Sequence, residues 1–506
     1  MENLTRQQAS RFLDMATMGV RQDELTTFQT LNDRNAWLNQ QIELPHFNQL
    51  ERTRYQQTQR NLLEPTQDCR VGAWFDSALW DKAQLRQRVA FALSQIFVVS
   101  DRDANLTQQP EALANYYDLL LDGAFGRYVD LLRNVTLSPV MGLFLTMAGN
   151  KPQSVTGQLP DQNYAREVMQ LFSIGLYTLN HDGTVVSDGT GTQLEAYTDQ
   201  DVEALSRLFT GWEIEGGNLM QPMRENNEFH DMNEKHILGE HYPAGQSASQ
   251  DLEQFLLQVS RHPNTAPFIC TLLIKRLVTS NPTQDYIAHV ANAFTVSDGD
   301  LSYVIRAILT YPTILEPSGG LDPSARQIAK VREPILAMTY LYRAMGAYPG
   351  KNGDIVYNPM DYKNTFRQYP LGAPSVFNFF QPNDMPSGEL KNQNLTAPEL
   401  SIIDWQSLID LSNIVYRLLQ DFGRNRSNSN TPTELYIAPI DLENMANAGQ
   451  RDELIEAINV RFLNGNGSPN VLDRITSIYD GHSNKYYAVP KMLFIALISP
   501  EFMVQE

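Results

Sequence analysis

The amino-acid sequence predicts an all-α fold, namely a large helical domain with long irregular loops and a small β-hairpin insertion. Apolar residues recur at the spacing of one helix face through most of the chain, as Leu85, Val89 and Ile96 do in one segment. Sequence signals for strands are few. The 506 residues, of which 42% are apolar, are enough to bury a sizeable core.

The predicted helices follow one another along the chain. They cover residues 81–96, 111–121, 161–176, 199–209, 251–259, 266–278, 282–294, 301–309, 331–345, 401–419, 451–462 and 491–497. Thr198 or Asp199 stands at the N-cap position of the helix that ends at residue 209. Pro282 stands in the predicted first turn of its helix, where the missing N–H is not needed.

Two long stretches interrupt this helical pattern. Asp182 to Thr192 is rich in glycine and aspartate, which predicts a turn-rich hairpin. We expect a main domain over residues 1–399, with loop excursions at 182–250 and 354–398. A C-terminal helical lobe is expected over 400–506, packed on the main domain. Loops of this length inside a domain are usually functional or mobile.

The charge balance excludes several kinds of partner. With 39 basic and 58 acidic residues the net charge is −19, so nucleic acids and anionic membrane surfaces are disfavoured as ligands. No apolar run reaches the roughly 18 residues that a membrane span requires. Residues 1–20 are polar where a signal peptide needs an apolar segment, so we expect either a cytoplasmic protein or one whose leader is already removed.

The two cysteines exclude a disulfide scaffold and a zinc site made of four thiolates. Cys270 lies in an apolar run and is expected to be a small buried hydrophobe. A bridge between Cys69 and Cys270 is the less favoured alternative.

The first candidate site is a polar stripe on the helix predicted over 161–176. Asn163, Arg166, Glu167 and Gln170 follow the i, i+3, i+4 and i+7 spacing of one helix face. We expect this stripe to point into a cavity shared with the loop that carries His230. A buried Glu167 beside a cation is suited to act as acid, base or ligand. A structural network or a solvated face is the alternative.

The second candidate is a histidine cluster. His230, His236 and His241 lie within twelve residues, next to Asp231. Imidazole and carboxylate groups are typical ligands of zinc and non-haem iron, so His230, Asp231 and His236 are the candidate ligands of a divalent metal. Histidines on the surface of a polar loop are the alternative.

The third candidate consists of cationic side chains. Arg207, followed by Thr210 and Gly211, and the pair Lys275–Arg276 each have the donors to hold a carboxylate, sulfate or phosphate. Arg207 can equally pair with Glu203 one turn back. A structural role is favoured for Lys275.

The fourth candidate is the loop over 354–398, where aromatic rings alternate with amides and prolines. Its rings belong to Tyr357, Tyr362, Phe366, Tyr369, Phe377, Phe379 and Phe380. Aromatic faces among amides suit a glycan or a peptide ligand. A loop pinned to the core by its aromatic residues is the alternative.

Several stretches, in order, resemble a bacterial family known as domain of unknown function 1800. They are LRQRVAFALSQIFVVS at 85–100, PDQNYAREVMQLFSIGLYTLNHDGT at 160–184, YTDQDVEALSRLFTGW at 197–212, HPNTAPFICTLLIKRLVTSNP at 262–282, LGAPSVFNFFQP at 371–382 and ALISPEFMVQ at 496–505. The resemblance implies a helical protein that is often exported, hence periplasmic or secreted. It also implies a protein partner that resembles exported sulfatases and alkaline phosphatases.

Two functions follow as hypotheses. The first is an envelope or extracellular binding or assembly protein that acts with such a partner, because the sequence has no G-x-S-x-G elbow, Walker loop or G-x-G-x-x-G motif. The alternative is a hydrolase-like enzyme, metal-assisted, that uses Glu167, His230 and Asp231.

Overall fold

The computed structural model describes residues 2–315, 329–349, 363, 366–420, 435–437 and 439–505. Within these ranges the chain is mostly helical, with short pairs of strands and irregular loops. The predicted fold class is therefore confirmed. Of the predicted 354–398 loop, residues 354–362, with Tyr357 and Tyr362, and residues 364–365 lie outside the described residues.

The first helices surround the N-terminal part of the core. They are α1 (Arg6–Ala16), α2 (Gln22–Leu31), α3 (Arg34–Glu43), α4 (Gln49–Gln59), α5 (Gln67–Trp80), α6 (Gln84–Ser94), α7 (Pro110–Gly123), α8 (Tyr128–Leu137) and α9 (Pro139–Phe144). Side-chain caps fix several of their starts: Thr5, Asp33, Asn48 and Thr66 each accept a hydrogen bond from a backbone N–H of the first turn.

The middle and C-terminal helices continue the same architecture. They are α10 (Gln153–Thr156), α11 (Asn163–Gln170), α12 (Asp199–Leu208), α13 (Ala248–Ser260), α14 (Thr265–Leu277), α15 (Gln284–Val296), α16 (Leu301–Thr310), α17 (Pro334–Ala344), α19 (Glu389–Asn392), α20 (Trp405–Gln420), α21 (Ile440–Asn447), α22 (Arg451–Leu463), α23 (Pro469–Gly481) and α24 (Lys485–Leu497). Short 3₁₀ turns are η1 (Glu215–Gly217), η2 (Asn227–Phe229), η3 (Pro312–Leu315) and η5 (Pro398–Ser401).

The strands form antiparallel pairs of two or three residues. They are β1 (Trp212–Glu213) with β2 (Arg224–Glu225), β3 (Lys235–Ile237) with β4 (Glu240–Tyr242), β5 (Lys330–Val331) with β8 (Val504–Gln505), and β6 (Tyr348–Pro349) with β7 (Leu435–Tyr436). The pair β5–β8 ties the segment before α17 to the C-terminal end of the chain. Strands this short close loops and do not build a layer of the fold.

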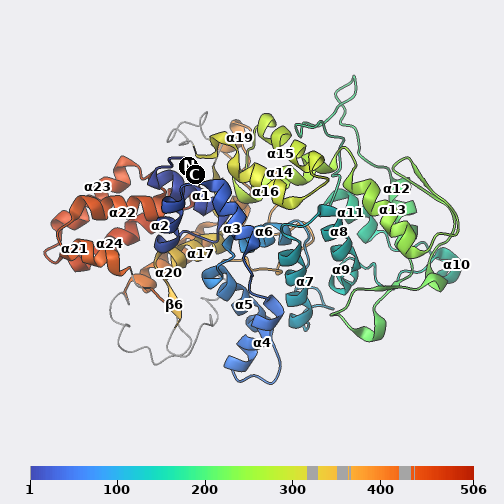
Figure 1. Ribbon diagram of the computed structural model, residues 1–506, viewed down its shortest axis with the longest axis horizontal. Helices are drawn as coiled ribbons and strands as arrows, with labels where there is room; N and C mark the ends of the chain where they lie inside the picture. The colour runs from blue at the N-terminus through green and yellow to red at the C-terminus, as the bar shows by residue number, and fades with distance from the viewer. Residues whose placement is uncertain are drawn as a thin grey trace.

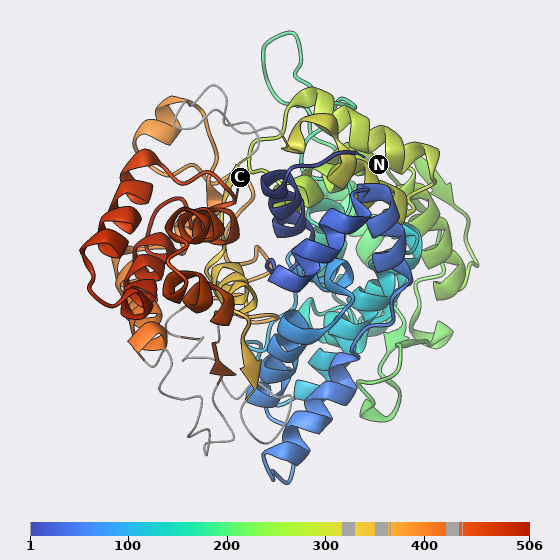
Figure 2. The same ribbon diagram turned by 60° about the vertical axis from the view of Figure 1, so that its left-hand side comes forward.

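The predicted hairpin is present as an arm, residues 176–196. Isolated bridges join Leu179 to Val185 and Ser187 to Gln193. Figures 1 and 2 show this teal segment projecting beyond α14 and α15. The base of the arm packs against the body of the protein, whereas its tip is exposed.

The helices are arranged along one long axis. In Figure 1, α12 and α13 lie at one end and α21 to α24 at the other, with α6 and α14 to α16 between them. One continuous hydrophobic cluster runs through the molecule and includes Phe12, Leu93, Leu273 and Leu493. Since α22 contacts both α1 and α17, the C-terminal helices share this core. A domain boundary at residue 400 stays a prediction.

Two predicted helix boundaries need correction. Helix α11 ends at Gln170 and not at Leu176, because Gly175 has a positive φ of 75° and its N–H bonds back to the Met169 carbonyl. Helix α15 begins at Gln284 behind an N-cap at Thr283, so Pro282 precedes the helix. Among the described residues no helix combines the length and the hydrophobicity of a membrane span. Both cysteines are buried and free, as expected for Cys270.

Candidate functional site

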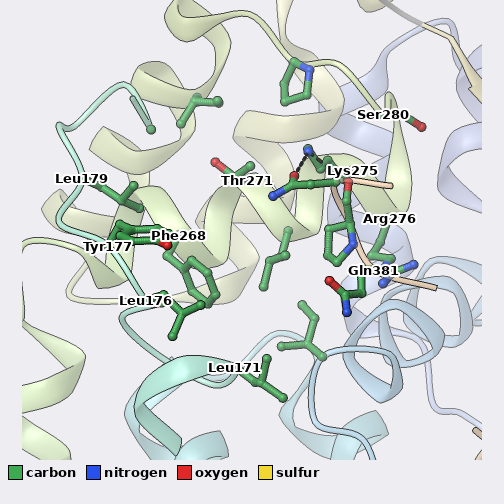
Figure 3. A pocket seen from close by; sticks show the side chains of 18 of the residues that line it. Leu171, Leu176, Tyr177, Leu179, Phe268, Thr271, Lys275, Arg276, Ser280 and Gln381 are labelled. Carbon is green, nitrogen blue, oxygen red and sulfur yellow. Dashed lines mark hydrogen bonds between the residues drawn. The ribbon is translucent and has the colours of Figure 1, made fainter. Parts of the chain in front are cut away.

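A cavity of about 700 Å³ lies beside α14, and we call it the α14 cavity (Figure 3). Its walls come from the end of α6, the end of α11, the base of the arm, α14 with the start of α15, and the loop over 371–382. This volume is within the range of small-molecule sites. Four of the stretches that carry the family resemblance, 85–100, 160–184, 262–282 and 371–382, meet here.

One side of the α14 cavity is apolar. Its residues are Leu171, Leu176, Tyr177, Leu179, Val185, Phe268, Leu272 and Ile287. In Figure 3, Leu171, Leu176 and Phe268 approach one another from α11, the arm and α14. This side can bury the hydrocarbon part of a ligand, at roughly 25 cal/mol per Å² of apolar surface removed from water.

The opposite side is polar and carries positive charge. It contains Lys275 and Arg276 together with seven carboxamide side chains, those of Gln95, Gln170, Asn281, Asn378, Gln381, Asn383 and Asn394. None of the residues that line the cavity is an aspartate or a glutamate. In a chain of net charge −19, this local excess of cations is a specific feature of the cavity.

Arg276 is the central group of the polar side. It is 4% exposed, and its guanidinium lies 4.7 Å from the centre of the Phe380 ring. Within the described part of the chain, this guanidinium donates no hydrogen bond and forms no ion pair. Burial lowers the pKa of Arg276, and the charges of Glu333 and Glu399 oppose that shift. Arginine nevertheless keeps its proton in proteins.

Behind Arg276 lies a buried charged cluster. Its cations are Arg88, Arg276 and Lys330, and its carboxylates are Glu333 and Glu399, all of them almost completely buried. The Lys330 Nζ lies 3.3 Å from a Glu399 oxygen and 3.6 Å from a Glu333 oxygen. Asp14, which pairs with Arg332, also acts on Arg88. With that pair included, four cations face three carboxylates, so one positive charge is uncompensated among the described residues.

Three buried polar atoms of cavity-lining residues have no partner. They are the Gln95 Oε1, the Ser280 Oγ and the Asn378 Nδ2, on side chains that are 6%, 2% and 6% exposed as residues. The orientation of Gln95 is fixed, because its Nε2 donates to Glu333 at 2.5 Å. Unpaired buried polar groups cost roughly 1–3 kcal/mol each. A ligand group can reach these atoms only if neighbouring atoms shift, because each has almost no accessible surface.

Lys275 serves both the fold and the cavity. Its Nζ donates to the Pro382 carbonyl at 3.1 Å and to the Asn383 Oδ1 at 2.7 Å, which holds the end of the 371–382 loop on α14 (Figure 3). Burial, with a smaller effect of Arg276, lowers the pKa of Lys275 to about 8. The predicted structural role is consistent with these contacts, but Lys275 also supplies charge to the cavity.

The base of the arm is held by Asn264, just before α14. Its Oδ1 accepts from the Leu179 N–H at 2.9 Å, and its Nδ2 donates to the carbonyls of Ile174 and Tyr177. At Gly175, a Cβ would come within 2.8 Å of the Phe268 ring, so only glycine fits against this wall. These contacts keep the apolar side of the cavity in place.

The stripe on α11 does not point into one shared cavity. Asn163 is exposed, and Arg166 forms a long, exposed ion pair of 3.6 Å with Asp199. Glu167 is buried with an unpaired Oε2, and burial raises its pKa despite the nearby Arg166. Gln170 alone of the four lines the α14 cavity, which includes neither Glu167 nor His230.

His230 belongs to a second buried network, between α12 and α13. Its Nε2 lies 3.1 Å from an Asp251 oxygen, and its Nδ1 lies 2.9 Å from the Thr210 carbonyl. The Lys235 Nζ donates to the same Asp251 oxygen at 2.7 Å. The turn that brings this loop close depends on Gly211, where a Cβ would meet the Asn226 carbonyl at 2.7 Å. We call these residues, with Arg207 and Asp231, the His230 network.

Arg207 pairs with Asp231 and not with Glu203. Its Nε and Nη2 lie 2.8 and 3.3 Å from the two Asp231 oxygens. Burial raises the pKa of Asp231, but hydrogen bonds from Arg207 and Asn233 outweigh burial and bring the pKa to about 2. The Arg207 guanidinium and the Asp231 carboxylate therefore pair with each other, and this ion pair holds the loop on α12.

The candidate metal ligands are separated. His236 lies on β3, exposed, with its ring 4.9 Å from that of His241, whereas His230 is buried in its own network. Over the described ranges there is no group of three or more His, Cys, Asp or Glu side chains placed to hold a metal ion. His230, Asp231 and His236 thus do not come together as ligands of one ion.

The sequence reasoning missed Gln95, Ser280 and Asn378. Gln95 stands inside the apolar run that ends at Val99, and Asn378 stands between aromatic residues in VFNFF. A polar side chain within an apolar run is the signal that would have drawn attention to both.

Comparison of the sequence with known proteins identifies the family of the chain. A family model described as protein of unknown function (DUF1800) matches residues 11–504, nearly the whole chain. No curated protein and no solved structure matches the chain. The resemblance found in the sequence is confirmed, and the function has to be inferred from the site itself.

Proposed function

The chain belongs to the DUF1800 family of proteins of unknown function, and we propose that it is a binding protein whose α14 cavity holds an organic anion with an apolar body. The observation that carries this proposal is the unpaired, buried guanidinium of Arg276 in a cavity that has no carboxylate in its wall.

The unpaired charge of Arg276 has an energetic cost. A buried cation without a partner is expensive, and removing it from water is offset when an anion approaches it closely. Arg276 has all of its side-chain donors free for a carboxylate, which it can hold with two parallel hydrogen bonds. Lys275 adds a second positive charge at neutral pH. The ligand is therefore expected to be negatively charged at one end.

The shape of the cavity defines the rest of the ligand. The apolar side formed by Leu171, Leu176 and Phe268 faces away from the cations, so a ligand with separate charged and hydrocarbon parts matches both sides (Figure 3). An inorganic anion would leave the apolar side unused. The expected ligand is an organic acid with a hydrocarbon part.

Calorimetric titration with octanoate and octanamide tests the proposal. Octanoate is expected to bind at least about tenfold more tightly than the uncharged amide, because only the acid compensates Arg276. Arg276→Gln should weaken octanoate binding by about 10- to 100-fold and leave octanamide binding unchanged. Arg306→Gln, on the exposed side of α16, is the matched control.

Two results would contradict the proposal. One is equal binding of octanoate and octanamide, and the other is unchanged octanoate binding by a folded Arg276→Gln variant. Circular dichroism confirms that each variant is folded before it is titrated.

The narrower role implied by the family resemblance stays a prediction. It holds that the protein works in the envelope or outside the cell, with a partner that resembles exported sulfatases or alkaline phosphatases. Co-purification of the two proteins under mild conditions tests it, and clean separation would count against it. The hydrolase alternative needs Glu167 to act together with His230 and Asp231, and it also stays a prediction.

A further inference from the structure

We infer that the α14 cavity takes the carboxyl-terminal end of a peptide, with the terminal carboxylate against Arg276 and an aliphatic last side chain on the apolar side. This inference rests on the proposed function and specifies the chemical class of its ligand. It depends on the neutral polar groups of the cavity, which a simple organic acid does not use.

Two buried side-chain atoms of the cavity wall, one acceptor and one donor, have no hydrogen-bond partner. The Gln95 Oε1 receives no hydrogen bond, and because the Gln95 Nε2 is held by Glu333, that oxygen can only accept. The Asn378 Nδ2 has no acceptor. A fatty acid offers no donor to Gln95, whereas each peptide unit offers one N–H and one C=O.

The wall of the cavity is rich in carboxamide side chains. Seven lining residues are carboxamides, and the amides of Gln170, Asn378, Gln381 and Asn394 form no side-chain hydrogen bond among the described residues. A carboxamide presents a donor and an acceptor side by side and so matches a peptide unit. Asn378 has a positive φ of 65°, a conformation that asparagine tolerates well, and this places its side chain on the cavity wall.

The charge and the apolar side of the cavity favour a peptide over a glycan. A neutral glycan would leave the Arg276 charge uncompensated, and the opposite side of the cavity is mostly aliphatic, with Leu171, Leu176, Leu272 and Ile287. Branched hydrocarbon surface of this kind fits the side chain of leucine, isoleucine or valine. A peptide end supplies carboxylate, amide groups and such a side chain in one molecule.

The test compares four probes by calorimetric titration of the full chain. They are an acetylated tetrapeptide that ends in leucine with a free carboxyl group, the same peptide with a terminal carboxamide, octanoate, and a trimer of galacturonic acid. The free-acid peptide is expected to bind at least about tenfold more tightly than each of the other three. Asn378→Gly keeps the positive φ and should weaken the free-acid peptide by about three- to tenfold while octanoate is unchanged.

The outcomes distinguish the two levels of inference. If octanoate or the galacturonate trimer binds as tightly as the free-acid peptide, the peptide inference is overturned while the anion-binding proposal stands. If the carboxamide peptide binds as tightly as the free acid, the role of Arg276 in the peptide site is refuted. If none of the anions binds, the proposed function itself fails.

Discussion

The α14 cavity and the His230 network are both built from buried charged groups, but their charges are balanced differently. In the His230 network two cations, Arg207 and Lys235, face two carboxylates, Asp231 and Asp251, within hydrogen-bonding distance. Around the cavity, Arg276 keeps its charge without a partner in the described residues. Removing one member of a balanced buried network destabilises the fold, whereas an uncompensated buried cation is a candidate site for an anion.

Lys235→Met should have the largest effect, because it breaks the balance of the His230 network. The change leaves Asp251, which is fully buried, with His230 as its remaining partner. Removing one member of a buried pair costs about 3–5 kcal/mol of unfolding free energy, measured by urea titration. Lys82→Met, on an exposed lysine, is the control and should change stability by less than about 0.5 kcal/mol. A loss below about 1 kcal/mol would show that the network is not structural.

Asp231→Asn should lower the stability of the protein by an amount that depends on pH. The pKa of Asp231 is lowered from 3.8 to about 2 in the folded state, so its ionised form stabilises the protein above pH 3.8, and this contribution is lost as the pH falls toward 2. The variant should be about 2 kcal/mol less stable than the unsubstituted protein at pH 6. The difference should shrink toward zero at pH 2. A difference that did not depend on pH would contradict the ion pair.

Ligand binding should weaken as the pH rises, because Lys275 loses its charge. The Asp231 ion pair, in contrast, weakens as the pH falls. The Lys275 pKa of about 8 means that this side chain loses its charge as the pH rises from 7 to 9. Octanoate affinity should therefore fall about three- to fivefold over this range, a change in binding free energy of about 1 kcal/mol. Lys275→Met should bind octanoate more weakly at pH 7 and show little change with pH. A flat profile in the unsubstituted protein would remove Lys275 from the anion site.

Arg276→Gln provides the direct counterpart of Lys235→Met. Without a ligand the Arg276 charge has no partner, so its removal balances the cluster that contains Glu333 and Glu399. The unfolding free energy should change by less than about 1 kcal/mol, far less than for Lys235→Met. Urea titrations of both variants side by side measure the difference. Equal losses in the two variants would make Arg276 a structural residue like Lys235.

Glu167→Gln should have the smallest effect. Burial raises the pKa of Glu167, so its ionised form costs stability above the folded-state pKa, and this cost disappears below 4.5. The variant should be as stable as the unsubstituted protein at pH 7, or slightly more stable, with no difference at pH 4. Octanoate binding should not change, because Glu167 does not line the cavity. A marked loss of stability at pH 7 would indicate a partner for the carboxylate.

More of the fold than of the candidate site could be predicted from the sequence. Periodicity located twelve helices, most of them to within a few residues, because burying one apolar face is a local property of the chain. It did not identify α1 to α5, α8 or α23. It overran at α11, where Gly175 and the return of the chain to Met169 end the helix early. The polar stripe on α11 had the right spacing, but its members have different environments, since spacing does not say what lies opposite.

The charged candidate residues also differ in how far their partners could be predicted from the sequence. The pair Lys275–Arg276 was recognised as a possible anion site, yet Gln95, Ser280 and Asn378 were not, because they are far apart in the chain. For Arg207 the sequence offered Glu203, one turn away, while the folded chain supplied Asp231. A nearby partner can be read from helix geometry, and a distant one cannot.

The sequence by itself determined the helical class, the absence of a cysteine framework, the acidic character and the family, because these depend on composition, local periodicity and ordered motifs. Only the tertiary structure decided which charges are neutralised. Electrostatic compensation acts over a few ångströms in space, so it depends on which distant segments are brought together around α14 and around His230.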